Sequence, residues 1–245
     1  MPVAMITGGA SWISRATAKL LIADGWQVGL YDIDATETAK AVAEVGGAKV
    51  ASGGLLDVGD LAAVVKTVAD LTRDRGPIGA LVNVAGGTSF MRFGRPKFVE
   101  TTPDQWDKVF CPNIYGVLNC VHAVLPGMIE AKKGVIINLT SGLAWKPRSG
   151  TSLYSLSTAG LIAFTQSLCQ ELGPLGIRIN SVAPGSTESR WKPDLGDAPF
   201  IDKLPPLGRR TKAHEIAEGI VWLISDKASH ITGICLDISG GTGLR

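Results

Sequence analysis

The chain has few charged residues, and its positive and negative charges nearly balance. Only 19% of its 245 residues are charged, against about 25% in an average protein. The formal net charge is +2, and the sequence contains no basic tract. Disordered chains combine high charge with few apolar residues, whereas 45% of this chain is hydrophobic. We therefore expect a folded protein that binds neither nucleic acid nor an anionic membrane.

Long apolar runs and paired cysteines are also missing. No segment approaches about 18 consecutive apolar residues, so no transmembrane helix is expected. The first residues, MPVAMITGG, lack a basic region and reach glycine too early for a signal peptide. The four cysteines are scattered without a CxxC pair. This usage predicts reduced thiols in a cytoplasmic protein and no metal site.

Glycine, in contrast, is abundant. The chain has 30 glycines, well above the usual share of about 7%, and they do not recur at every third position as in collagen. In an apolar chain, such an excess predicts many tight turns or close backbone approaches.

Short β-branched runs alternate with longer helical patterns along the whole chain. Strands are expected at 3–7, 27–32, 49–57, 80–85, 134–140, 177–183 and 233–238. Helical patterns lie near 12–24, 36–45, 60–75, 104–130, 151–173 and 213–225. Asp60 and Asp104 are expected to be N-caps, and Pro112 is expected to kink the longest helix. The alternation predicts an α/β fold, a Rossmann-like doubly wound parallel sheet of about seven strands, in a single domain 1–245.

Two long irregular segments, 86–103 and 185–211, follow expected strands at their carboxyl ends, where open α/β sheets bind ligands. Loops longer than about 12–15 residues are usually functional. Their aromatic and sulfur side chains, among them Met91, Phe93 and Trp191, predict an apolar pocket for a small-molecule substrate. A surface insertion or a subunit contact is the alternative.

The turn after the first strand reads T-G-G-A-S-W-I-S over residues 7–14, and Asp32 ends the second strand. A glycine-rich turn followed by an acid about 20 residues on is the dinucleotide-binding layout. At this turn the chain resembles the short-chain dehydrogenase/reductase family, whose turn reads T-G-x-x-x-G-x-G.

The resemblance continues through essentially the whole chain. The segment N-V-A-G at 83–86 is similar to the family's N-N-A-G, and Asn113 stands at the family's structural asparagine. Ser141 precedes Tyr154 by the family's spacing, and P-G at 184–185 matches its motif after the sixth strand. The resemblance implies three sets of residues: a catalytic set of Ser141, Tyr154 and Asn113; cofactor contacts at Gly8, Asp32, Asp57, Asn83 and Gly86; and substrate contacts that include Trp145, Pro184 and Gly185. It also implies a homodimer or homotetramer.

Three residues depart from the family pattern. Trp12 and Ser14 replace the second and third glycines of the turn, and Thr158 replaces the lysine of Y-x-x-x-K. We expect the Trp12 indole to fill the nucleotide cleft, although it would leave the cleft open if it turned outward. Losing the lysine removes the cation that lowers the tyrosine pKa in the family and a cofactor anchor. Two alternatives are open for Lys146 and Arg148: one of them replaces the missing cation, or both are solvated surface charges.

These departures favour a cleft that no longer holds NAD. The Thr7 to Trp12 spacing partly resembles the halohydrin dehalogenases, in which the cleft became a halide pocket. The leading expectation is a cofactor-independent, lyase-like or dehalogenase-like enzyme in which Ser141 and Tyr154 act on a hydroxyl, carbonyl or epoxide oxygen. One alternative is an NAD(H)-dependent alcohol dehydrogenase or ketone reductase, in which Asp32 favours NAD over NADP. A second is a noncatalytic binding subunit.

Overall fold

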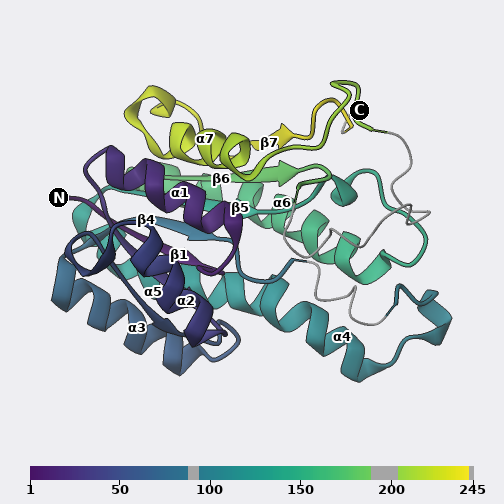
Figure 1. Ribbon diagram of the computed structural model, residues 1–245, viewed down its shortest axis with the longest axis horizontal. Helices are drawn as coiled ribbons and strands as arrows, with labels where there is room; N and C mark the ends of the chain where they lie inside the picture. The colour runs from purple at the N-terminus through teal and green to yellow at the C-terminus, as the bar shows by residue number, and fades with distance from the viewer. Residues whose placement is uncertain (88–93, 189–203, 243–245) are drawn as a thin grey trace.

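A parallel seven-stranded sheet forms the centre of the protein (Figure 1), as the sequence predicts. The computed structural model describes residues 1–87, 94–188 and 204–242. The strand order is β3-β2-β1-β4-β5-β6-β7. The strands are β1 (Val3–Thr7), β2 (Gln27–Asp32), β3 (Ala51–Leu55), β4 (Ile78–Asn83), β5 (Gly134–Leu139), β6 (Ile177–Pro184) and β7 (Cys235–Ile238).

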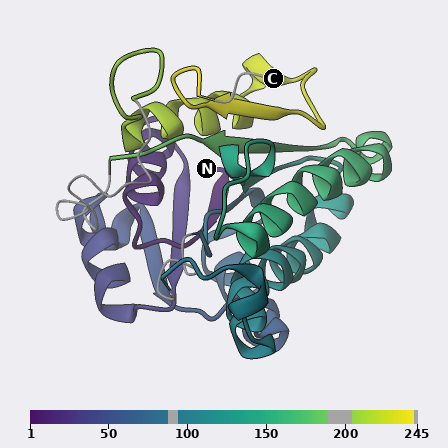
Figure 2. The ribbon, with the colours of Figure 1, turned by 90° about the vertical axis from the view of Figure 1, so that its right-hand side faces the viewer.

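Helices cover both faces of this sheet (Figure 2). They are α1 (Trp12–Ala23), α2 (Ala35–Glu44), α3 (Leu61–Arg75), α4 (Pro103–Phe110), α5 (Gly116–Ala131), α6 (Ser152–Leu172) and α7 (Ala213–Ile224). On one face, α1, α2 and α7 bury residues such as Leu21, Ala41 and Ile220 against the sheet. On the other, α3, α5 and α6 bury Leu71, Val121 and Leu161. Because both faces are covered, the strands carry the nearly continuous apolar runs that the sequence shows.

The order of the strands fixes where a ligand can bind. The chain winds outward from β1 through β2 to β3, and then returns to place β4 on the other side of β1. In open α/β sheets, ligands bind at the carboxyl ends of the strands beside such a reversal, which here lies between β1 and β4. Thr7, Asp32, Asn83 and Pro184 each end a strand at that edge.

The expected single helix over 104–130 is broken at Pro112. A π-helical turn, η4 (Cys111–Tyr115), separates α4 from α5, because proline has no N–H to donate and its ring displaces the preceding turn. By length and apolar composition alone, the joined run Pro103–Ala131 passes the test for a membrane-spanning helix. Core helices pass the same test, and Val121, Val124 and Met128 of this run are buried in the core.

The two expected N-caps have different outcomes. Asp60 caps α3, and its carboxylate accepts a hydrogen bond of 3.1 Å from the Ala63 amide. Asp104 does not cap α4: Thr102 is the cap residue, and the Gln105 side chain accepts from its amide at 3.1 Å. Pro103 takes the first helical position, for which its fixed φ is suited, so Asp104 lies within the first turn, where its charge favours the helix dipole.

Candidate active site

The turn after β1 is held tightly against the end of β4. The Thr7 hydroxyl accepts hydrogen bonds from the Val84 and Ala85 amides at 3.2 and 3.3 Å. Gly8 has a φ of +64°, and a Cβ there would lie 2.7 Å from the Ala85 nitrogen. Glycine is therefore required at this position both by the backbone conformation and by the close approach.

Asp32 and Ser14 complete this turn. The Asp32 carboxylate is half-buried and accepts hydrogen bonds from the Ala10 amide at 3.1 Å and the Asp34 amide at 3.2 Å. Ser14 is fully buried, and its hydroxyl donates to the Gly8 carbonyl at 2.7 Å. Because this small side chain satisfies its own hydrogen bond inside the turn, serine is compatible with the family's third glycine position.

The Trp12 side chain lies at the surface, so the structure gives no support to the expectation that it fills the nucleotide cleft. It is 43% exposed, and it lines a surface hollow together with Arg15 and Lys19 of α1 and Lys212 and His214 beside the start of α7. Trp12 is the first residue of α1. Arg15 and Lys19, three and seven residues later, therefore lie on the same face of the helix. That face points outward, toward the N-terminal end of α7.

Ser141 and Tyr154 come together where the β5–α6 connection meets the first turn of α6. The Ser141 hydroxyl bonds to the Tyr154 side chain, and it accepts from the Leu143 amide at 3.2 Å. Tyr154 is only 7% exposed and packs in a small cluster with Val109, partly buried Leu143 and Leu153. Burial raises the pKa of Tyr154 to about 12, and the Ser141 hydrogen bond only partly opposes this rise. The phenol is therefore neutral near pH 7 and holds a proton that it can donate.

No cation replaces the family lysine at position 158. Thr158 is buried, and its hydroxyl donates to the Tyr154 backbone carbonyl at 3.0 Å. The Thr158 hydroxyl therefore has its hydrogen-bond partner within α6, and its side chain adds no charge to the site. The Lys146 ammonium is exposed and donates to the Thr242 carbonyl at 2.6 Å.

Asn113 links the π-helical turn to the loop after β4. Its side-chain oxygen accepts from the Gly87 amide at 2.7 Å, and its side-chain nitrogen donates to the Val109 carbonyl at 2.8 Å. Gly86 has a φ of +110°, and a Cβ there would lie 2.6 Å from the Asn113 side-chain oxygen. Asn83 donates to Asn138 at 2.9 Å, which ties β4 to β5. These contacts hold the loop after β4 against the π-helical turn and hold the end of β4 against β5.

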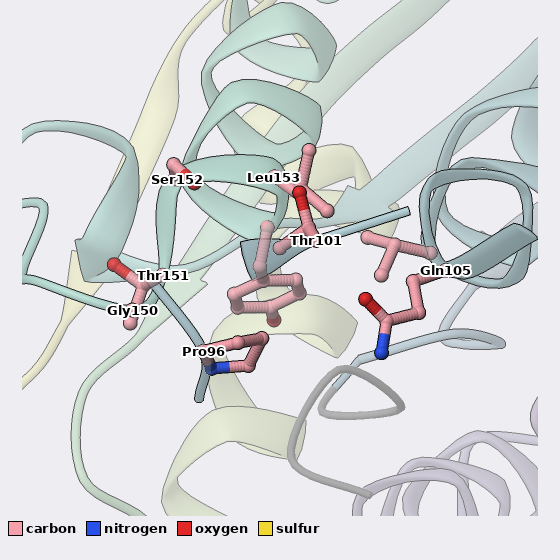
Figure 3. Close-up of a pocket in the computed structure, with 9 residues that line it drawn as sticks. Pro96, Thr101, Gln105, Gly150, Thr151, Ser152 and Leu153 are labelled. Atoms are coloured by element: carbon pink, nitrogen blue, oxygen red, sulfur yellow. The ribbon is translucent and has the colours of Figure 1, made fainter. Parts of the chain in front are cut away.

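A shallow pocket lies next to Tyr154 (Figure 3). Residues before and within α4 face the beginning of α6 across it. Its lining residues are Pro96, Thr101, Gln105, Val109, Gly150, Thr151, Ser152, Leu153 and Tyr154. The sequence predicts the long segment 86–103 as a substrate loop but gives no prediction for residues 150–153, which also line the pocket. These residues lie immediately before Tyr154 at the start of its helix, and that position is the signal by which they could have been found.

The remaining expected residues have varied positions. Asp57 is exposed and accepts from the Gly59 amide at 2.8 Å. Trp145 is half-buried in the turn after β5, and Pro184 is buried at the end of β6. Gly185 packs against Ser239, where a Cβ would lie 2.7 Å from the serine Cβ. None of these four lines the pocket beside Tyr154. Met91, Phe93 and Trp191 lie outside the described residues.

The first turn has the donors and the acid that a dinucleotide requires. The amino end of α1 follows the glycine turn directly, and such a helix terminus favours a phosphate group. The Asp32 carboxylate stands beside that turn, within hydrogen-bond distance of its Ala10 amide. Since Trp12 lies on the outer face of α1 and Ser14 is satisfied internally, the residues present fit a dinucleotide.

Several known proteins that are similar to this chain bear the names of reductases. A family model described as enoyl-(acyl carrier protein) reductase matches residues 8–243. An acetoacetyl-CoA reductase of Shinella zoogloeoides is 33% identical over 242 residues, which cover 98% of this chain and 97% of that protein. A solved short-chain dehydrogenase/reductase family protein matches with a TM-score of 0.86 and 32% identity, covering 100% of this chain and 98% of the other. A 3-oxoacyl-[acyl-carrier protein] reductase from Brucella melitensis with bound NAD matches with a TM-score of 0.88 and 30% identity, covering 100% and 92%.

These findings overturn the leading functional expectation. A cofactor-independent lyase or dehalogenase was expected because Trp12, Ser14 and Thr158 all depart from the family pattern at cofactor contacts. The relatives instead bear the names of reductases, one of them with NAD bound, and Trp12 is exposed on the outer face of α1. The finding favours the alternative, an oxidoreductase that uses a nicotinamide cofactor. By the family model over residues 8–243 and by these full-length relatives, the chain belongs to the short-chain dehydrogenase/reductase superfamily.

Proposed function

We propose that the protein is an NAD(H)-dependent ketone reductase in which Tyr154 donates a proton to the carbonyl oxygen of the substrate. The observation that carries this proposal is the buried Tyr154 phenol, hydrogen-bonded to Ser141 at the carboxyl edge of the sheet. The names of the relatives, which are reductases of 3-oxoacyl and acetoacetyl thioesters, support a 3-oxo compound as the substrate class.

The cofactor would be held by residues around the β1–α1 turn. In this proposal Gly8 and the amino end of α1, which includes Trp12 and Ser14, would hold the pyrophosphate. Asp32 would hold the adenosine ribose, and Asp57 the adenine. Asn83 and Gly86 at the end of β4, together with Thr158, would hold the nicotinamide half. When bound, the nicotinamide supplies the hydride that the chain itself cannot provide.

Proton transfer is the part of the reaction that the chain performs. Ser141 holds the substrate oxygen by a hydrogen bond, and the neutral Tyr154 phenol donates its proton to that oxygen. Asn113 positions the loop after β4 through the Gly87 amide. Because no cation stands at position 158, the phenolate that remains is not stabilised by charge, so Tyr154 serves better as an acid than as a base. Trp145, Pro184 and Gly185 are proposed to lie along the substrate's path.

The direct test is cofactor binding followed by turnover. We expect NADH to bind with micromolar affinity, measured by calorimetry, and to be oxidised when a 3-oxo ester or thioester is added, measured by the loss of absorbance of NADH. Failure to bind either NADH or NADPH contradicts the proposal. Binding without turnover of any ketone, aldehyde or 3-oxo thioester contradicts its catalytic part and favours a binding subunit.

Asp32→Asn is expected to shift the cofactor preference toward NADPH. A carboxylate at this place accepts from the ribose hydroxyl of NADH and repels the extra phosphate of NADPH. We expect the ratio of the Kd for NADPH to the Kd for NADH to fall about tenfold or more. Asparagine keeps a side-chain oxygen for the Ala10 or Asp34 amide. Asp24→Asn, an exposed acid at the other end of α1, is the control, and an unchanged ratio in Asp32→Asn would remove Asp32 from the site.

Two broader expectations stay predictions. No disulfide joins the four cysteines, all of which lie among the described residues, and this is compatible with the expected cytoplasmic location. A homodimer or homotetramer is expected from membership of the family, and sedimentation of the purified protein measures it.

A further inference from the structure

None of the described residues that line the pocket beside Tyr154 is charged. Its walls are made of apolar groups, among them Pro96, Val109 and Leu153, and of a few neutral polar side chains. An ionised group placed against these walls would lose hydration without gaining a partner of opposite charge, which is costly. The part of a ligand that enters this pocket is therefore expected to be uncharged, with its oxygen atoms held by hydrogen bonds.

The two threonines of the pocket have no proton left for a ligand. The Thr101 hydroxyl donates to the Phe98 carbonyl at 2.7 Å and accepts from the Trp106 indole at 2.8 Å. The Thr151 hydroxyl donates to the Arg148 carbonyl at 2.7 Å and accepts from the Arg148 amide at 3.0 Å. A hydroxyl has a single proton to donate. Since each threonine uses that proton within the protein, neither is a donor for a ligand.

Gln105 differs from these threonines, because only one end of its amide group is used. It lies in the first turn of α4, and its side-chain oxygen accepts from the Thr102 amide at 3.1 Å. This bond fixes which end of the amide is the oxygen, so the NH₂ group is the end that remains. The NH₂ group has no hydrogen-bond partner among the described residues. In Figure 3 the Gln105 side chain extends toward the pocket from the side opposite Gly150 and Thr151.

Helix packing sets the position of Gln105 relative to Tyr154. Val109 lies four residues after Gln105, so the two share one face of α4. Val109 is buried and packs against Tyr154, which shows that this face of α4 is turned toward α6. Gln105 is itself half-buried, and both it and Tyr154 line the pocket. The unused NH₂ group and the phenol therefore belong to one site.

We propose that the Gln105 NH₂ group donates a hydrogen bond to a second, uncharged oxygen of the substrate while the reacting carbonyl lies at Tyr154. This inference rests on the proposed reductase function and adds to it a residue that selects among ketones. A ketone without a second oxygen leaves the NH₂ group unpaired in the complex, which weakens binding, whereas an ester or thioester carbonyl pairs with it. The Ser152 hydroxyl also lines the pocket, but Ser152 is exposed, so water competes for it.

The test compares two ketones of the same length, methyl acetoacetate and 2-hexanone, of which only the first has an ester group. The measured quantity is the ratio of kcat/KM for methyl acetoacetate to kcat/KM for 2-hexanone, with NADH as the reductant. The ester also changes the intrinsic reactivity of the ketone, but this contribution cancels when variants are compared. In Gln105→Met, which keeps the length of the side chain and removes the donor, the ratio should fall about threefold to tenfold.

Gln105→Glu separates the donor from the helix cap. A glutamate at this position can still accept from the Thr102 amide, as in the usual capping box, so α4 keeps its first turn, but a carboxylate has no N–H to donate. At pH 7 the ratio should fall at least as far as in Gln105→Met, because the carboxylate also repels the ester oxygen. Gln166→Glu makes the same replacement at an exposed position of α6 and should leave the ratio unchanged.

The outcomes distinguish this inference from the proposed function. A ratio that falls in both Gln105 variants and not in Gln166→Glu supports the contact. An unchanged ratio in either Gln105 variant, or an equal loss for the two ketones, overturns the contact and leaves the reductase standing. If the parent protein reduces neither ketone, the ratio is taken from the two Kd values, measured by ligand-detected NMR. A Kd ratio that depends on Gln105 then supports the contact and contradicts the reductase, and one that does not depend on it overturns both.

Discussion

Replacing Tyr154 with Phe is expected to lower kcat for ketone reduction by about 10²–10⁴-fold, the usual contribution of a positioned acid. The phenylalanine ring keeps the volume that Tyr154 fills beside Val109 and Leu153, so the change removes the hydroxyl and little else. The Kd for NADH should stay within about twofold of the parent value, because the phenol is assigned to the substrate oxygen and not to the cofactor. Single-turnover NADH oxidation and calorimetry measure the two quantities.

The control for this prediction is a second tyrosine. Tyr115 is exposed and is the last residue of the π-helical turn, so Tyr115→Phe removes a hydroxyl elsewhere and should leave kcat unchanged. If Tyr154→Phe retains turnover within about threefold, the phenol is not the proton donor. In that event a water molecule or another hydroxyl near Ser141 supplies the proton.

The fold was readable from the sequence because parallel strands buried on both faces leave a strong signal. The first two strands were predicted at their observed bounds, Val3–Thr7 and Gln27–Asp32. The ends of helices and strands were harder to predict, because neighbouring residues compete for the capping position. Thr102 and Asp104 both suit a helix start, and Pro103 decided between them by occupying the first helical position.

The contact between Ser141 and Tyr154, the proposed catalytic pair, was predictable for a different reason, namely their spacing in the sequence. Ser141 and Tyr154 lie thirteen residues apart, one at a strand end and the other in the following helix. The direction of the Trp12 side chain was not readable, because it depends on how α1 packs against α7. Sequence spacing places Trp12 at the cofactor turn, but only packing shows that its indole faces outward. The cofactor prediction read three departures, at Trp12, Ser14 and Thr158, as the loss of the cofactor, and the named relatives contradict it.

Thr158→Lys is expected to raise the rate of alcohol oxidation at pH 8 by about 10–1000-fold. Oxidation requires the Tyr154 phenolate as a base. With a pKa of about 12, only about one phenol in 10⁴ is ionised at that pH. A cation one helix turn away lowers the pKa of such a partner by about 1–3 units, and the ionised fraction rises by the same factor. In the parent protein the oxidation rate should keep rising about tenfold per pH unit to the alkaline limit of the assay, whereas in Thr158→Lys it should level off at a lower pH.

Reduction should respond in the opposite sense, and this contrast is the sharper test. Because the acid form of Tyr154 is present below its pKa, the parent reduction rate should be independent of this group from pH 6 to 10. A lower pKa in Thr158→Lys makes the rate decline begin earlier on the alkaline side. Thr158→Met adds similar length without charge, and it should leave both pH profiles in place. If the lysine and methionine variants have the same profiles, the missing cation does not control the Tyr154 proton. If only the lysine variant shifts, the residue at position 158 sets the pH range over which Tyr154 holds its proton.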